Sequence, residues 1–333
     1  MEENTQIVPP SPARRRFAAY AWFVTALTLA VILWGAFVRA SKSGDGCGAH
    51  WPLCNGSVVP DASQAKALVE FAHRATSGVA FLLVAALYWW ARRAYKRGHP
   101  VRAAAALSGL FIVTESLIGA GLVLLRLVGD NTSVERAAYL SVHLVNTFLL
   151  VAALALTAWW ASTGETARPR LARFLRGRVG AALVGSLALG VSGAVAALGA
   201  TLFPDAAEPS AALAAMTPAS RLLFSLRHYN LHPLVAVVVG AYLVYFAAAL
   251  MREGGGERVR RWGRAVLSLV AAQFAAGLLN AALLAPIWLQ IVHLLLADLL
   301  WLALVLLSAS SLARDATSPE GLGRVELRPA VEV

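Results

Sequence analysis

The sequence predicts an all-α integral membrane protein with eight transmembrane helices arranged as two pseudo-symmetric four-helix bundles. Of its 333 residues, 59% are hydrophobic and 14% are charged, and the mean hydropathy is +0.65. Soluble domains contain roughly 45–50% apolar and about 25% charged residues. The apolar residues gather in stretches near the ~20 residues that cross a bilayer as a helix. We place the eight helices at 17–40, 68–91, 102–126, 135–161, 178–203, 226–250, 262–285 and 288–312.

The first stretch is expected to remain as a helix rather than to be cleaved as a signal peptide. It is too long, and it ends in Arg39 and Lys42 without a small-residue cleavage site. The formal net charge is +11, and basic residues cluster at 14–16, 92–102, 168–178 and 258–264. Because these clusters fall on alternate connections, we expect those connections and both termini to be cytoplasmic. The positive charge therefore indicates how the helices are oriented in a cell (inner or plasma) membrane. We expect lipid, and no nucleic acid, as a partner.

The connection at 41–67 lies on the opposite side of the membrane and carries both cysteines of the chain, Cys47 and Cys54. A disulfide persists in such an oxidising compartment, so we favour a structural bridge. The alternative is a metal site that also uses His50. However, C-x2-H-x3-C lacks a fourth ligand and resembles no standard zinc spacing.

A long basic connection at 162–177 divides the helices into two sets of four. The predicted units are a tail at 1–16, a bundle at 17–161, the linker at 162–177, a bundle at 178–312 and a tail at 313–333. Each set begins and ends in the cytoplasm, so an axis along the membrane normal would relate the two halves. Short repeats support a duplication. They are Gly35-Ala36 with Gly193-Ala194, and Glu115-x3-Gly119 with Gln273-x3-Gly277.

Four histidines form the stronger repeat, one on each helix that enters from the outer side. They are His73, His143, His232 and His293. Each is expected roughly five to nine residues into its helix, which at ~1.5 Å per residue places all four at a similar depth. A single buried histidine is usually a packing residue bonded to a carbonyl. Four at one depth favour axial ligation of haem iron, with up to two haems, one in each half.

Polar residues near the histidines make the two halves unequal. Glu70 and His73 share a helical face, so a carboxylate would lie beside the first-half histidine as a general base or proton relay. The alternative is a structural ion pair between Glu70 and Arg74. The corresponding segment before His232 holds Arg227 and no carboxylate.

The sequence also suggests roles for other polar and aromatic residues. Arginines near outer helix ends either bind carboxylates such as haem propionates or extend to the interface. They are Arg39, Arg74, Arg126 and Arg227. Asn146 is expected to orient His143, and Glu115 and Asp298 are expected to be protonated packing groups. The pairs Trp89-Trp90 and Trp159-Trp160 are expected in interfacial belts.

These residues resemble the haem A synthase family along essentially the whole chain. The segments that carry the resemblance are GAFVRASKSGDGC at Gly35, WPLCNG at Trp51, EFAHR at Glu70, SVHLVNTF at Ser141, LHPLVA at Leu231 and LQIVHLLLADLLW at Leu289. Three positions depart from the family pattern. Pro233 stands where an arginine is common, Glu115 where a glutamine is common, and CGAHWP replaces CPDWP, which leaves His50 without a role.

The resemblance implies an oxidoreductase that acts on a CH group. Haem O would be oxidised at one methyl, through an alcohol, to the formyl group of haem A, for cytochrome oxidase biogenesis. His232 and His293 would bind a resident haem b, with Arg227 as a further contact. His73 and His143, with Arg74 nearby, would hold haem O, and Glu70 matches the family's essential acid. The loop with Cys47 and Cys54 would cover the first-half site.

The implied partners are a haem O synthase, cytochrome oxidase assembly factors and a second copy of the chain in a homo-oligomer. Two alternatives to the enzyme remain. A transmembrane bis-histidine cytochrome b that carries electrons explains the four histidines but leaves Glu70 and the disulfide loop without a role. A transporter with parallel repeats explains the duplication but not the histidines.

Overall fold

The computed structural model describes residues 11–61, 63–164, 177–203, 217–229, 231–254 and 256–317. Within these ranges the chain is helical and contains eight helices that are long and apolar enough to cross a membrane, as predicted. The first four are α1 (Pro12–Ala40), α2 (Ala65–Ala94), α3 (Pro100–Leu124) and α4 (Val134–Thr163). The second four are α6 (Gly177–Leu202), α9 (His232–Arg252), α10 (Glu257–Ala282) and α11 (Ile287–Thr317).

Local sequence explains where several helices begin and end. The Ser11 hydroxyl accepts a hydrogen bond from the Arg14 amide at the start of α1, and Ser133 caps α4 in the same way. Gly164 ends α4 with a positive φ of 75°, a conformation that glycine adopts without steric cost.

The sixth predicted helix, 226–250, is wrong at its start. A separate short helix, α8 (Pro218–Tyr229), precedes the spanning helix, which begins only at His232. Proline fits the first turn of a helix, where its missing N–H has no intrahelical partner to lose, so Pro233 favours a helix that begins here. His232 is therefore the first residue of α9 rather than several residues inside it.

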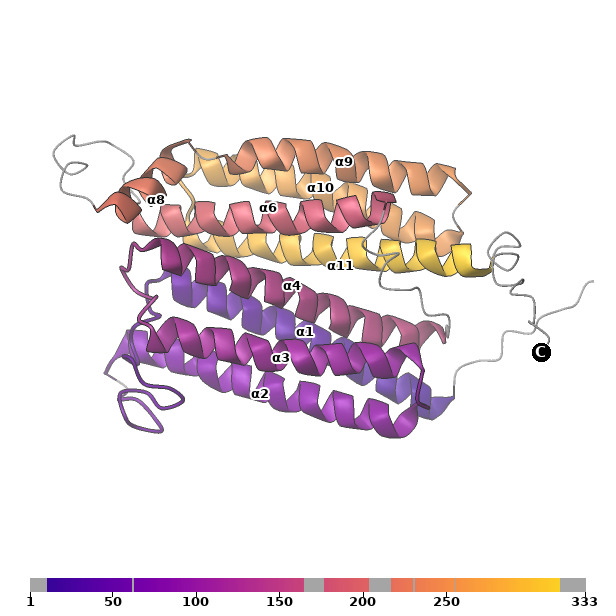
Figure 1. Ribbon diagram of the computed structural model, residues 1–333, viewed down its shortest axis with the longest axis horizontal. Coiled ribbons are helices and arrows are strands. Elements are labelled where there is room, and N and C mark those ends of the chain that lie inside the picture. The colour runs from indigo at the N-terminus through magenta and orange to yellow at the C-terminus, as the bar shows by residue number, and fades with distance from the viewer. Residues whose placement is uncertain are drawn as a thin grey trace, which may run out of the picture.

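The helices form two adjacent groups, α1–α4 and α6 with α9–α11 (Figure 1). Contacts of α11 with α1 and α4, and of α6 with α4, join the groups. At this junction Trp301 donates an indole hydrogen bond of 2.7 Å to the Phe148 carbonyl and stacks on its ring. The division into bundles at 162–177 stays a prediction, because residues 165–176 lie outside the described ranges.

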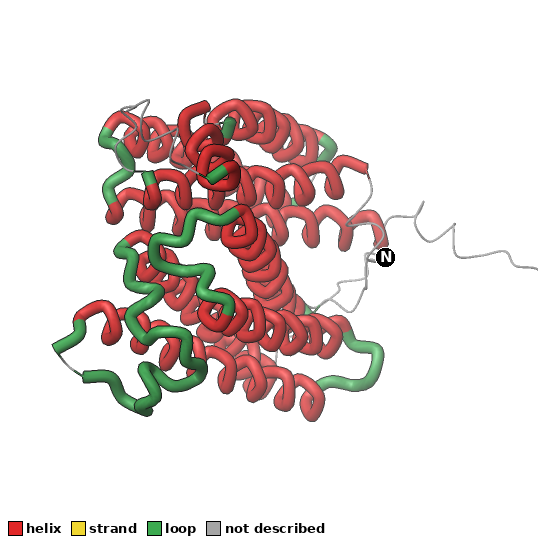
Figure 2. The backbone as a smooth tube through the Cα atoms, turned by 60° about the vertical axis from the view of Figure 1, so that its left-hand side comes forward, coloured by secondary structure: helices red, strands yellow, loops and turns green. Residues whose placement is uncertain are grey.

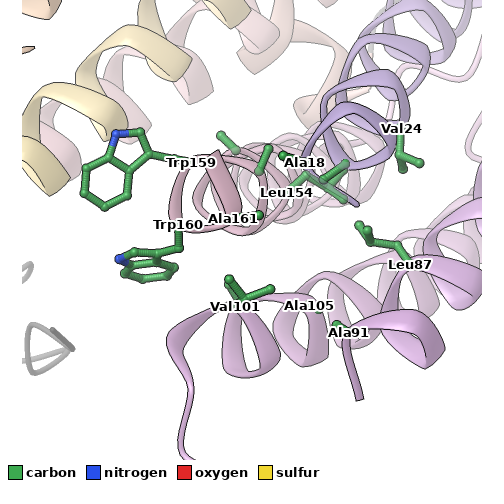
Figure 3. Close-up of a cluster of buried hydrophobic side chains, with 14 of the residues drawn as sticks. Ala18, Val24, Leu87, Ala91, Val101, Ala105, Leu154, Trp159, Trp160 and Ala161 are labelled. Atoms are coloured by element: carbon green, nitrogen blue, oxygen red, sulfur yellow. The ribbon is translucent and has the colours of Figure 1, made fainter. Parts of the chain in front are cut away.

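The larger buried clusters lie toward the end of the molecule where α1 begins. In the first group the cluster draws on the first part of α1 and α3 and the last part of α2 and α4 (Figure 3). Trp159 and Trp160 belong to it and are buried, so their predicted place in an interfacial belt is wrong. The reason is that α4 packs on both groups, which covers its end from several sides.

Loops gather at the opposite end. When that end is turned forward, the connections between helices lie across the helix ends (Figure 2). The predicted orientation of the two termini in the membrane stays a prediction.

Candidate functional site

Glycines on neighbouring helices make room for three of the four histidines. A Cβ added at Gly35 would lie 2.8 Å from Cε1 of His73, one at Gly193 would lie 3.1 Å from Cε1 of His232, and one at Gly277 would lie 3.3 Å from Cε1 of His293. Real Cβ atoms essentially never make a contact as short as the first, and the other two are tighter than nine in ten real Cβ contacts. The glycines of the sequence repeats therefore define close helix contacts at which imidazoles pack.

The second-half histidines face one another. The ring centroids of His232 and His293 are 6.5 Å apart, with an interplanar angle of 88°. Two imidazole–metal bonds of about 2 Å, with ring radii of roughly 1.1 Å, separate centroids by about 6 Å. The separation of the two rings is therefore compatible with both residues holding one haem iron.

Hydrogen bonds around this pair leave the coordinating nitrogens free. Ser192 Oγ lies 2.9 Å from Nδ1 of His232, which leaves Nε2 of that ring for a metal ion. Gln273 donates to the main-chain carbonyl of His293 at 3.1 Å and so holds the first turns of α11. A histidine ligand usually has its second ring nitrogen bound, as His232 does, whereas Nδ1 of His293 has no hydrogen-bond partner among the described residues.

In the first half, Glu115 rather than Asn146 contacts His143. The carboxylate Oε1 lies 3.2 Å from Nδ1 of His143. Asn146 donates to Oε2 at 2.6 Å, and the Thr147 hydroxyl donates to Oε1. Glu115 is thus hydrogen-bonded to two residues of α4, and its predicted protonated state stays a prediction. Asn146 contacts Glu115 rather than the imidazole of His143, so the expectation that Asn146 orients His143 directly is wrong. The result is a carboxylate–histidine pair of the kind that orients metal ligands.

Asp298 is buried, as predicted, but no hydrogen-bond partner for its carboxyl oxygens is found in the described part of the chain. The expected hydrogen-bonded packing role therefore lacks a partner there.

The predicted disulfide between Cys47 and Cys54 is present, and both cysteines are buried. Their sulfurs are therefore not available as metal ligands, and the alternative of a metal site with His50 is wrong. The bridge closes a turn that packs on Ala67 and Phe71 of α2. The loop thus covers the first turns of the helix that carries Glu70 and His73.

Glu70 is the residue that fastens this loop. Its side chain is buried, and its Oε2 accepts a 2.8 Å hydrogen bond from the main-chain amide of Cys47. Arg74 donates to Oε1 of Glu70 and, through Nη1, to the carbonyls of His50 at 2.6 Å and Leu53 at 2.7 Å. The ion pair that the sequence left as an alternative is therefore present, and it extends into the loop.

These hydrogen bonds determine where the side chains of Glu70 and Arg74 lie. Among the described residues, no hydrogen bond or ion pair joins Glu70 to His73. The donors of Arg74 serve Glu70 and the loop, so its predicted contact with bound haem stays a prediction. The side chain of Arg227 lies outside the described residues, and its predicted role stays a prediction too.

The loop is also tied to the connection between α3 and α4. Lys42 Nζ donates to Asp130 at 2.7 Å on the surface. This hydrogen bond and the charge of Lys42 hold the pKa of Asp130 below its ordinary value. Exposed ion pairs contribute little to stability, so this contact positions the loop more than it holds the fold together.

Sequence reasoning missed two contacts. One is Glu115 with His143, although the repeat of Glu115 and Gln273 was a signal for it. The other is Arg39, whose guanidinium reaches from α1 to α6 and α11. Nothing local in the sequence indicates those partners.

Comparison with known proteins adds a family match. The family described as cytochrome oxidase assembly protein, COX15-CtaA, matches residues 18–305. A protein of Thermus thermophilus named Protoheme IX farnesyltransferase is 51% identical over 314 residues, which are 93% of this chain and 51% of that protein. The chain thus spans about half the length of this relative.

Proteins named Heme A synthase match over shorter segments. That of Exiguobacterium sibiricum is 37% identical over 109 residues, 33% of this chain and 37% of that protein. That of Geobacillus kaustophilus is 43% identical over 105 residues, 31% of this chain and 33% of that protein.

Proposed function

The chain belongs to the cytochrome oxidase assembly protein family COX15-CtaA, and we propose that it is a haem A synthase of the cell membrane. In this proposal one methyl group of haem O is oxidised to an alcohol and then to the formyl group of haem A. The first step adds the oxygen of water to the methyl carbon and releases two electrons and two protons, and oxidation of the alcohol to the formyl group releases two more of each. An external electron acceptor takes up all four electrons. Haem O is the substrate, and haem A is the product.

The second half would hold a resident haem b through His232 and His293. The separation of their rings supports this assignment. Ser192 orients His232, and Gly193 and Gly277 leave room for the two imidazoles. When bound, such a haem supplies one-electron redox chemistry, which suits it to pass on the electrons released by the substrate.

The first half would bind haem O through His73 and His143. Gly35 makes room for the imidazole of His73, and Glu115 orients His143. The disulfide loop lies over this half and limits the access of solvent. Glu70, held beneath the loop, would accept protons during methyl oxidation and pass them outward once its contact with Arg74 is exchanged.

The observation that carries the proposal is the inequality of the two histidine pairs. One pair has a ring separation compatible with two ligands of one metal ion. The other belongs to the half where a buried acid and a disulfide loop are fastened together. A protein that only carried electrons would leave the buried acid and the disulfide loop without a role.

The name of the Thermus relative fits a neighbouring step. This chain matches about half of that protein, so its farnesyl transfer can reside in the part that has no counterpart here. Farnesylated haem would then be the substrate of the matched part. We propose on this basis that a haem O synthase is a partner, together with cytochrome oxidase assembly factors and a second copy of the chain.

The test is to express the chain in a host that lacks haem A, with and without a haem O synthase, and to extract the pigments. Haem A and its alcohol precursor should appear only when both proteins are present. Haem b without haem A would favour the electron-carrier alternative. Conversion of protohaem to haem O by this chain alone would favour farnesyl transfer instead.

A further inference from the structure

Arg39 links the two halves at the end of the molecule where the histidines lie. It stands near the end of α1, in the first group of helices. Its Nη1 donates to the Ala197 carbonyl at 2.9 Å and to the Thr201 hydroxyl at 2.6 Å, both on α6. Its Nη2 donates to Gln290 Oε1 on α11 at 3.0 Å. All three partners belong to the second half.

None of these partners carries a negative charge. A guanidinium group has five N–H donors, and the three hydrogen bonds leave two of them, on Nε and Nη2, without a partner among the residues that the structure describes. No carboxylate in those ranges lies within ion-pair distance of Arg39. A partly buried cation surrounded by neutral acceptors is costly unless an anion completes its shell. The planar guanidinium group of arginine can donate two parallel hydrogen bonds to a carboxylate.

The position of Arg39 relates it to the second histidine pair. Gln290 precedes His293 by three residues, so both lie on one face of α11 and are about 4.5 Å apart along the axis. Thr201 and Ala197 follow Gly193, which packs against His232, on α6. The guanidinium therefore lies on the loop side of the two imidazoles, between the helices that flank them.

The duplication allows the position of Arg39 to be compared with its counterpart in the second half. Arg39 follows Gly35 by four residues, and Ala197 follows Gly193 by four residues, so these two positions correspond. The second half has no cation of its own at this place, and it receives that of the first half. In addition, Pro233 follows His232 directly, where an arginine would otherwise be available to the same site.

We propose that Arg39 binds a propionate carboxylate of the haem held by His232 and His293. The first half thus contributes one residue to the cofactor site of the second half. This inference rests on the haem site assigned under the proposed function, and it adds a carboxylate-binding position to that site.

The experiment compares two forms of one ligand. Full-length protein made in a haem-deficient host is titrated in detergent with protohaem and with protohaem dimethyl ester, which lacks the carboxylates. Arg39→Gln should weaken the binding of protohaem by roughly 10- to 100-fold, the range of a hydrogen bond to a charged group, and should leave the binding of the ester unchanged. Arg15→Gln, which changes an exposed arginine at the opposite end of α1, serves as the control and should alter neither.

A second variant separates ligand binding from helix packing. Thr201→Val removes one neutral partner of Arg39 and retains the cation, so protohaem should keep most of its affinity. The midpoint potential of haem b in the purified holoprotein should fall in Arg39→Gln, because a nearby positive charge is lost, and should stay constant in Thr201→Val.

The outcomes are distinct. Equal losses for protohaem and its ester in Arg39→Gln would show that the arginine only joins the helices, or pairs with a protein carboxylate, and would overturn the inference. Unchanged binding of both ligands would overturn it as well. If His232→Ala binds protohaem as well as the wild-type protein does, the second-half haem site itself is wrong.

Discussion

The main-chain amide of Cys47 donates a 2.8 Å hydrogen bond to the buried carboxylate of Glu70. The cysteine lies in the loop after α1, and the acid lies in the first turns of α2. The disulfide therefore does more than close a short loop, since one of its residues positions the acid that we propose as a proton acceptor. Arg74 reinforces this link, because it binds both Glu70 and two loop carbonyls.

The first prediction concerns the loop. In a Cys47→Ser/Cys54→Ser variant, the amide of residue 47 should no longer be held against Glu70. A bridge with a sequence separation of 7 contributes roughly 2–3 kcal/mol on the chain-entropy scale, which is enough to order a loop but not to decide the fold. Haem A formation should fall, and haem b content should persist.

Hydrogen exchange of residues 44–57 provides the structural readout for this variant. Faster exchange in the loop alone is expected. Loss of protection throughout α2, or a parallel loss of haem b, would contradict a local role for the bridge.

The second prediction concerns the glycines beside the histidines. Gly35→Ala should displace the imidazole of His73, because the added Cβ would meet Cε1 at 2.8 Å. Gly193→Ala should displace the imidazole of His232 less, because the added Cβ would lie 3.1 Å from its Cε1. Haem b absorbance should therefore decrease in Gly193→Ala and not in Gly35→Ala. Gly78→Ala is the matched control, since nothing lies within 4 Å of its added Cβ.

The third prediction concerns Glu115. Glu115→Leu keeps most of the side-chain volume but removes the carboxyl group that faces Nδ1 of His143. Haem O turnover should decrease by about 10- to 100-fold, the usual cost of losing a group that orients a metal ligand. Gln273→Glu tests the corresponding position in the other half. There the side chain binds a carbonyl rather than an imidazole, so haem b should be destabilised. Equal turnover in wild type and Glu115→Leu would contradict this role.

The spans and the histidines could be predicted because bilayer thickness limits helix length and because ionisable residues stand out in apolar stretches. The break before His232 could not be located from hydropathy, which takes no account of the preference of Pro233 for the first turn of a helix. The Trp159-Trp160 pair was misplaced because burial of a helix end depends on how many neighbours that helix has.

Contacts within the site depend on side-chain directions that spacing alone does not determine. Glu70 shares a helical face with His73, yet its carboxylate turns to the Cys47 amide. Asn146 is one turn from His143, yet it donates to Glu115 on the neighbouring helix. In both cases a partner distant in sequence competes successfully with the nearer residue.

The fourth prediction separates the two histidine pairs. His232→Ala or His293→Ala should remove most b-type absorbance from purified protein. His73→Ala should retain that absorbance and lose haem A formation. If His73→Ala lost the b-type haem while both second-half variants kept it, the assignment of the halves would be reversed.

The fifth prediction tests whether Glu70 moves protons or only fastens the loop. Glu70→Gln preserves size but removes the titratable carboxyl group, and a general acid–base group typically contributes ~10²–10⁴-fold in rate. Haem A should fall to traces, with haem O or the alcohol accumulating, and haem b should remain. Pigments and bound haem are measured in one preparation.

Arg74→Gln is the matched variant for this test. It breaks the same ion pair and both loop contacts, but it leaves the carboxyl of Glu70 bound to the Cys47 amide. If Glu70 is the proton acceptor, Arg74→Gln should retain much more activity than Glu70→Gln, because the reacting group is still present. If Glu70 only anchors the loop, Arg74→Gln should lose at least as much activity as Glu70→Gln, because it also loses both contacts to the loop carbonyls. Near-normal haem A from Glu70→Gln would exclude the proton-transfer role outright.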